Sequence, residues 1–120
     1  MAAKTYDLYG IKEGDLAELS QALAPVLGVR FVLHDSDYLG GSYYRAELQG
    51  GVIKLQVNYL PFTKDWAEAE YKEYGMLLRV DAVQGADALR AAIEQGVAGT
   101  VVWLRRVVLE NGRKVLSRKE

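Results

Sequence analysis

Apolar and polar residues alternate along several stretches of this chain, which is typical of β-strands with one buried face. The alternation is clearest over residues 4–9 and 76–83, and a β-branched and aromatic run occupies residues 29–33. A long apolar stretch over residues 100–109 adds another strand. The predicted strands are 4–9, 29–33, 43–49, 52–58, 76–83, 100–109 and 113–118.

Apolar residues at helical spacing predict a first helix over Asp15–Leu27. Asp15 and Glu18 match a capping box, in which the Asp side chain accepts a hydrogen bond from a backbone N–H of the first turn. Gly28 is a natural C-terminal stop, and Pro25 is expected to bend or fray the last turn.

Two further helices are predicted from shorter patterns. Thr63 is the expected N-cap of a short helix over residues 64–72, and its acidic residues spread around much of the circumference. We therefore expect this helix to be the most exposed of the three. The third helix is expected to open near Asp87 and to close at Gly96.

Gly50-Gly51 predicts a two-residue hairpin turn, because both central residues of such a turn take positive φ. Folding there pairs Leu48 with Ile53 and Ala46 with Leu55, which gathers apolar residues on one face. A slip of one residue in either strand would mix the two faces, so the pattern favours this register.

Asn111-Gly112 predicts a second hairpin near the C-terminus. In the expected register Glu110 pairs with Arg113, and Val108 pairs with Val115. The resulting element order is β-α-β-β-β-α-β-α-β-β. We expect a single domain over residues 1–120 of the α+β class, with one largely antiparallel sheet of about seven strands and helices mainly on one face.

Composition narrows the classes of function. Half of the residues are apolar and about a quarter are charged, as in ordinary globular domains. The chain contains no Cys and one His, which removes disulfides, thiolate chemistry and a multi-histidine metal site within one chain. The start, Met1-Ala2-Ala3-Lys4, lacks the pattern of a signal peptide, and no apolar run approaches the roughly 20 residues that span a bilayer. These features predict a cytoplasmic protein with no membrane association.

The near-neutral charge of −1 hides an uneven distribution. Residues 103–120 carry six Lys or Arg against two Glu, so they sum to +4 and the first 102 residues sum to −5. Basic residues on strand edges usually keep a sheet from aggregating, and we do not expect nucleic-acid binding.

The most unusual stretch is residues 34–45, which we expect to form a loop after the strand 29–33 and to lead into the strand that begins at residue 43. It contains the single His, two Asp and three of the eight Tyr, with Gly40-Gly41 at its centre. His34, Asp35 and Asp37 provide a base and carboxylates, which in principle suit a metal-assisted hydrolase. Asp, Ser and Gly are also ordinary loop formers, so a structural loop without chemistry is the plain alternative.

Recognised catalytic motifs are missing from the sequence. It has no nucleophile elbow, Walker loop or HExxH motif, and Gly40-Gly41 lacks the following Lys of a phosphate-binding loop. We therefore expect a protein without enzymatic activity and without a cofactor. A small adaptor or ligand-binding module that uses residues 34–45 stays open as an alternative.

Protein binding is the interpretation that the side chains favour. Tyr buries a large area at a small entropic cost, and carboxylates attract a basic partner, although a solvated surface is the plain alternative for the acidic residues. The expected contact residues are Asp35, Asp37, Tyr38, Tyr43 and Arg45, with a second acidic patch of Asp65, Glu68, Glu70 and Glu73.

The string His-Asp-Ser-Asp-Tyr-Leu-Gly-Gly-Ser-Tyr-Tyr-Arg at 34–45 resembles a pattern in small bacterial immunity proteins. Those proteins neutralise the toxin domains of polymorphic and contact-dependent growth-inhibition systems. A Tyr-Asp-Leu strand, an amphipathic helix and Asn58 in the following hairpin extend the resemblance over about residues 4–80. It implies a cytoplasmic, cofactor-free protein that binds a cognate toxin domain. A nuclease toxin would suit the acidic patch, because enzymes that bind phosphate backbones tend to be basic.

Overall fold

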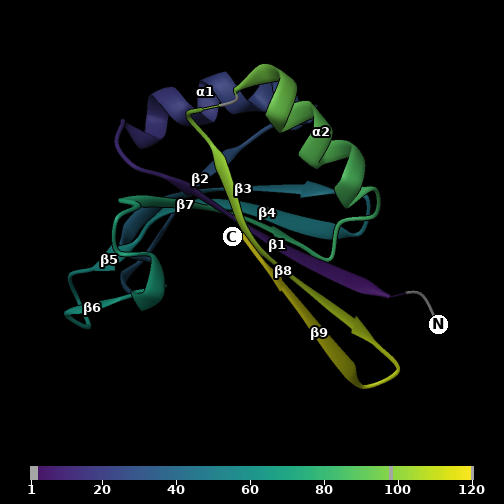
Figure 1. Ribbon diagram of the computed structural model, residues 1–120. Coiled ribbons are helices and arrows are strands. Elements are labelled where there is room, and N and C mark those ends of the chain that lie inside the picture. Colours follow the sequence, from purple (N-terminus) through teal and green to yellow (C-terminus); the bar gives the residue numbers. More distant parts are fainter. Residues whose placement is uncertain (1–2, 98, 120) are drawn as a thin grey trace.

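The computed structural model describes residues 3–97 and 99–119, and it contains a seven-stranded sheet and two α-helices (Figure 1). The strands run in the order β2-β3-β4-β7-β1-β8-β9, and every neighbouring pair is antiparallel. The predicted α+β class is thereby confirmed. The elements are β1 (Lys4–Ile11), α1 (Leu16–Leu27), β2 (Val32–Ser36), the 3₁₀ turn η1 (Asp37–Leu39), β3 (Gly41–Leu48), β4 (Gly51–Val57), β5 (Tyr59–Leu60), β6 (Asp65–Trp66), the 3₁₀ turn η2 (Ala69–Tyr71), β7 (Met76–Asp81), α2 (Ala86–Gly96), β8 (Val102–Glu110) and β9 (Arg113–Arg118).

Both α-helices cover the same face of the sheet, which we call the helix face (Figure 1). The predicted ends of α1 are confirmed: the Asp15 carboxylate accepts from the Glu18 N–H at 3.1 Å, and Gly28 takes the left-handed conformation. The helix continues through Pro25 to Leu27. The core between helices and sheet contains Tyr9, Ile11, Leu23, Leu27, Ile53, Leu55, Met76, Leu78, Val80, Val83, Ile93 and Val101.

The opposite face of the sheet is partly covered by residues 59–74, the segment between β4 and β7 (Figure 1). Tyr74 from this segment packs with Leu8, Leu77 and Leu104 in a second, smaller cluster. Gly10 makes room for it, because a Cβ there would lie 2.5 Å from the Tyr74 ring. Close packing of an aromatic ring on a strand glycine thus fixes the segment to the sheet.

The prediction of a helix over residues 64–72 is wrong. The 59–74 segment instead forms the short antiparallel pair β5–β6, followed by η2. Its backbone groups bond to the fully buried Asn58, whose Nδ2 donates to the carbonyls of Tyr71 at 3.0 Å and Tyr74 at 2.9 Å. Asn58 Oδ1 also accepts from the Glu68 N–H at 2.9 Å. Tertiary hydrogen bonds therefore replace the helical ones that local sequence favoured.

The β3–β4 hairpin has the predicted faces but a different register. Its turn lies at Gln49-Gly50, which pairs Ala46 with Ile53 and shifts the pairing by two residues from the expectation. A two-residue shift preserves the faces, so Ala46, Ile53 and Leu55 are buried as expected. Gly51 is needed in the strand because a Cβ there would lie 2.4 Å from the Asp81 carbonyl.

The C-terminal hairpin confirms its prediction in full. Glu110 pairs with Arg113 and Val108 with Val115 around Asn111-Gly112. The third predicted helix is confirmed as α2, which spans Ala86–Gly96. Within the described residues, no helix is both long enough and apolar enough to cross a membrane.

Candidate protein-binding surface

Residues 34–45 lie in the edge strand of the sheet and its neighbour, and the expected loop is reduced to residues 37–40. Val32–Ser36 form β2, the outermost strand, Asp37–Leu39 form η1, and β3 begins at Gly41. The predicted strand 29–33 is therefore displaced toward the C-terminus. Phe31 just before it packs against the core, so residues 29–31 connect α1 to the sheet.

The two glycines in this stretch have a structural role. Gly40 and Gly41 have φ of 86° and 98°, a region that side chains rarely adopt. A Cβ on Gly40 would also lie 2.2 Å from Cγ2 of Val57. Gly40-Gly41 thus lets η1 close tightly onto β4 and turn into β3.

The strand pairing divides the expected contact residues between the two faces. Leu33 pairs with Tyr44, which packs against the core, so Leu33 and Asp35 lie on the helix face. His34 and Tyr43 lie on the opposite face, where their rings stack at 5.5 Å. Arg45 shares that face and approaches Glu47 at 3.8 Å. A partner that contacts all of these residues must therefore reach around the sheet edge.

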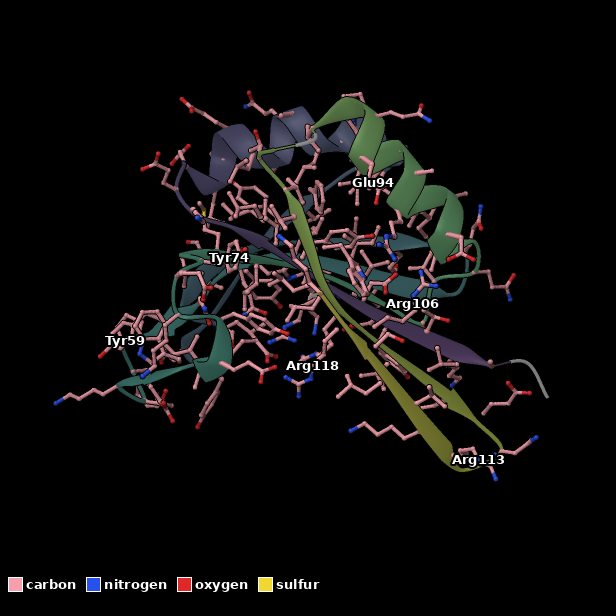
Figure 2. The ribbon with its side chains drawn as sticks, viewed as in Figure 1. Tyr59, Tyr74, Glu94, Arg106, Arg113 and Arg118 are labelled. Atoms are coloured by element: carbon pink, nitrogen blue, oxygen red, sulfur yellow. The ribbon has the colours of Figure 1, made fainter. Side chains whose placement is uncertain are left out.

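Tyr38 lies beside an aromatic residue that sequence analysis missed. Its ring packs edge to face against Phe62 of the 59–74 segment, with centroids 5.6 Å apart. Both rings are nevertheless exposed, Tyr38 at 70% and Phe62 at 62%. In the same segment Tyr59 packs against Trp66 at 5.2 Å, and Figure 2 shows Tyr59 at the end of the molecule farthest from the β8–β9 hairpin. An aromatic residue directly after Pro61 was the available signal for an exposed turn.

The edge strand itself exposes two aliphatic side chains. Val32 is 53% and Leu33 58% exposed, on opposite faces of β2. Large apolar side chains grouped at one edge are characteristic of interaction sites, whereas scattered ones are not. We define the β2-edge surface as Val32, Leu33, Asp35, Asp37, Tyr38, Tyr59 and Phe62.

The second predicted patch does not form as a continuous acidic surface. Glu68 contacts Arg105 through two hydrogen bonds of 2.9 and 3.0 Å and Arg79 at 2.9 Å, and its side chain is 14% exposed. Glu70 bonds to Arg118 at 2.5 Å, and Figure 2 shows Arg118 between the hairpin and the 59–74 segment. Glu68 and Glu70 therefore attach this segment to the basic side chains of the sheet.

These ion pairs are reflected in the pKa of Glu68. Burial alone would raise that pKa, but the hydrogen bonds and charges of Arg105 and Arg79 outweigh burial and lower it below its usual 4.5. The other two members of the predicted patch, Asp65 and Glu73, are exposed. Asp65 Oδ1 accepts from the Trp66 N–H at 2.8 Å.

A second ionic cluster lies beneath the start of α2. The fully buried carboxylate of Asp7 receives two hydrogen bonds from Arg106, at 2.8 and 2.9 Å, and Arg106 also donates to Asp87 at 2.6 Å. These bonds raise the pKa of Arg106. Nearby, burial and then the charge of Asp7 raise the pKa of the Tyr9 hydroxyl. The cluster anchors α2 to the sheet.

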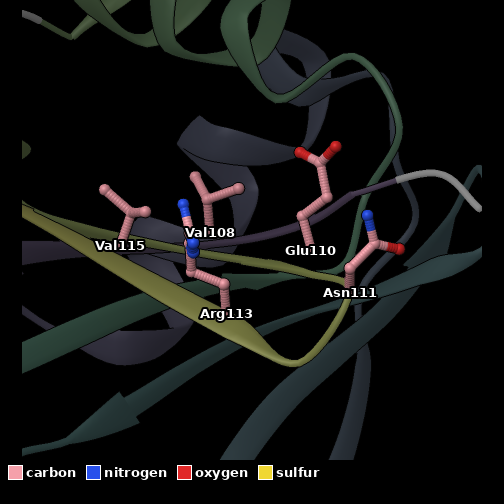
Figure 3. Close-up of a pocket in the computed structure, with 5 residues that line it drawn as sticks. All are labelled: Val108, Glu110, Asn111, Arg113 and Val115. Carbon is pink, nitrogen blue, oxygen red and sulfur yellow. The ribbon is translucent and has the colours of Figure 1, made fainter.

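A shallow cavity lies far from these candidate residues, along the β8–β9 hairpin (Figure 3). Its volume is about 400 Å³, and it is lined by Val108, Glu110, Asn111, Arg113 and Val115. None of the expected site residues lines it. Among the described residues, no group of three or more His, Asp or Glu side chains is placed to hold a metal ion.

No protein-family model matches this sequence. No curated protein matches it either.

Proposed function

We propose that this protein is a cytoplasmic immunity protein, which neutralises a cognate bacterial toxin domain by binding it one to one through the β2-edge surface. The observation that carries the proposal is the exposed Tyr38–Phe62 pair at the end of β2, the strand that also carries Asp35 and leads into Asp37. Neither carboxylate forms an ion pair with another described residue.

The composition of this surface suits a tight protein contact. Exposed aromatic side chains provide the central anchors of many interfaces, and truncating one typically weakens binding by more than tenfold. Tyr38 and Phe62 already support one another, so less side-chain freedom is lost on binding than for two isolated rings.

The charges indicate the kind of partner. Asp35 and Asp37 give the surface negative charge, which accelerates encounter with a positively charged protein. Toxins that act on nucleic acids are of this kind, because phosphate backbones are bound by basic surfaces. In this proposal the acidic residues that contact the toxin are Asp35 in β2 and Asp37 in η1. Tyr43 and Arg45 lie at the border of the interface. Glu68 and Glu70 are not part of it.

The test is co-expression of the tagged chain with the product of the gene immediately upstream. We expect a stable one-to-one complex and protection of the cells from that product's toxicity. The Tyr38→Ala/Phe62→Ala variant should lose protection. The matched control, Val115→Ala/Leu116→Ala, removes two exposed apolar side chains at the far edge of the sheet and should protect fully. The proposal would be contradicted if the upstream gene product is not toxic to the cells, or if the tagged chain elutes without it.

A further inference from the structure

The two edges of the sheet are protected to different degrees. The outer strand β9 carries Arg113, Lys114 and Arg118, and such charges are a common device against unwanted strand pairing. The opposite outer strand β2 has no Lys, Arg or Pro between Val32 and Ser36. Two of its five side chains are aliphatic and more than half exposed, whereas the exposed Val115 and Leu116 of β9 lie among its basic residues. An edge of this kind is favourable for pairing with another strand.

The hydrogen-bond pattern shows which backbone groups of β2 face outward. The two-residue turn after Leu48 makes Leu48 and Gly51 a hydrogen-bonded pair, and such pairs alternate along the hairpin. Arg45 and Tyr43 therefore direct their N–H and C=O groups toward β2, where they meet Val32 and His34.

It follows that the intervening residues of β2, Leu33 and Asp35, direct their N–H and C=O groups away from β3. β2 is the terminal strand of the sheet, and within the described chain no strand pairs with this outer side. Outward-facing N–H and C=O groups at an exposed sheet edge are the groups that pair with an added strand.

We propose that β2 captures its partner by strand addition, receiving an extended segment of the toxin that carries Lys or Arg opposite Asp35 and Asp37. This inference rests on the proposed function and specifies how the same surface binds. Charge complementarity selects a basic segment, because Asp35 and Asp37 are the charged side chains of β2 and η1.

The alternation of β2 also specifies the side chains of the added strand. In the added strand, the residue opposite Leu33 should be apolar, and the residue opposite Asp35 should be basic. Tyr38 and Phe62 stand where β2 ends, so they contact the segment as it leaves the strand. Backbone pairing then supplies affinity, while these side chains supply specificity.

Amide hydrogen exchange on the complex with the upstream gene product tests this mode of binding directly. In the free chain, the amides of Leu33 and Asp35 should exchange rapidly, whereas His34, bonded to β3, should be slower. In the complex, Leu33 and Asp35 should slow by at least about tenfold. A complex in which both remain fast would overturn strand addition while leaving the proposed function intact. Failure to form any complex would overturn both.

Paired substitutions separate the backbone contribution from the side chain. Leu33→Pro removes an outward N–H, while Leu33→Ala keeps it. We expect Leu33→Pro to weaken binding at least about tenfold more than Leu33→Ala. At the far edge, the alternation from the Asn111-Gly112 turn also directs the Leu116 N–H outward. Leu116→Pro and Leu116→Ala should therefore bind equally well.

Thermal unfolding of each variant shows whether the fold is retained. Leu33→Pro should melt close to Leu33→Ala, because the bonds between β2 and β3 are untouched. Equal affinities of Leu33→Pro and Leu33→Ala would overturn the proposal. So would an equal loss of affinity at both edges of the sheet.

Discussion

Tyr38 and Phe62 pack edge to face at 5.6 Å, although one belongs to η1 at the end of the edge strand and the other to the 59–74 segment. Two structural features bring them together. Gly40 allows η1 to close onto β4, and buried Asn58 holds the 59–74 segment in place. The residues that build the surface are thus different from those that we propose to contact a partner.

The aromatic pair should behave as one coupled binding element. We expect Tyr38→Ala and Phe62→Ala each to weaken toxin binding by about tenfold to a hundredfold, because each removes an interface anchor. The double variant should lose less than the product of the two, since each ring supports the other. The measurement is a double-mutant cycle of dissociation constants.

Stability measurements keep this prediction specific. Both rings are largely exposed, so each single variant should unfold within about 0.5 kcal/mol of the parent protein. Affinities that stay within twofold of the parent would remove Tyr38 and Phe62 from the proposed interface.

Asn58→Asp should destabilise the fold strongly while hardly changing side-chain size. The new carboxylate cannot donate to the carbonyls of Tyr71 and Tyr74, and it places a charge in a fully buried site. We expect a loss of about 3 kcal/mol in the free energy of unfolding, measured by urea denaturation. Asn111→Asp, in an exposed turn, is the control and should change it by less than about 0.5 kcal/mol. Equal stability of the two variants would refute the role assigned to Asn58.

Gly40→Ala should cost more stability than Gly28→Ala, although both residues have positive φ. Gly28 has φ of 68°, and no atom lies within 4 Å of the position that an added methyl group would take, so about 1 kcal/mol of backbone strain is expected. At Gly40 the methyl group would also collide with Val57, and we expect about 2 kcal/mol or more. Urea denaturation of the two variants gives the comparison. An equal cost would show that the contact with Val57 is unimportant.

Glu68→Gln should reveal a pH-dependent contribution to stability. The folded-state pKa of Glu68 lies below its usual 4.5, so its ion pairs stabilise the fold above pH 4.5. That contribution is lost as the pH falls through the folded-state pKa. At pH 7 we expect Glu68→Gln to be less stable by about 2 kcal/mol, with the difference shrinking below pH 4.5.

The exposed Glu73 provides the matched control for this series. Glu73→Gln should leave the free energy of unfolding within about 0.5 kcal/mol at every pH. Urea titrations at several pH values measure both variants. A Glu68→Gln difference that is constant with pH would contradict the ion-pair account.

Local sequence rules were sufficient where the determining atoms are close along the chain. Asp15 and Gly28 delimit α1, and the Asn111-Gly112 turn sets the pairing of β8 with β9. In both places a hydrogen bond or a positive φ within a few residues decides the structure. The α+β class followed because most of these local patterns were strong.

The errors lie where distant residues decide. Only Gly fits at position 51 of β4, because a Cβ there would lie 2.4 Å from the Asp81 carbonyl. The turn therefore lies one residue earlier, and Gln49 takes a positive φ of 46° that Gly would adopt more easily. The conformation of the 59–74 segment is set by hydrogen bonds to Asn58, and the helix that its own sequence pattern predicts does not form. Glu68 was predicted to contact a partner, but in the fold it pairs with Arg79 and Arg105. None of these contacts is visible in the spacing of residues.

The most direct test of the central claim is a calorimetric titration of the purified upstream gene product with this chain and with its Tyr38→Ala/Phe62→Ala variant. The proposal predicts one-to-one binding for the parent chain and binding weakened by at least about tenfold for the variant. It also predicts affinity that falls as salt is added, because Asp35 and Asp37 attract a basic partner. No binding heat at several temperatures, or equal affinity for both chains, would contradict it.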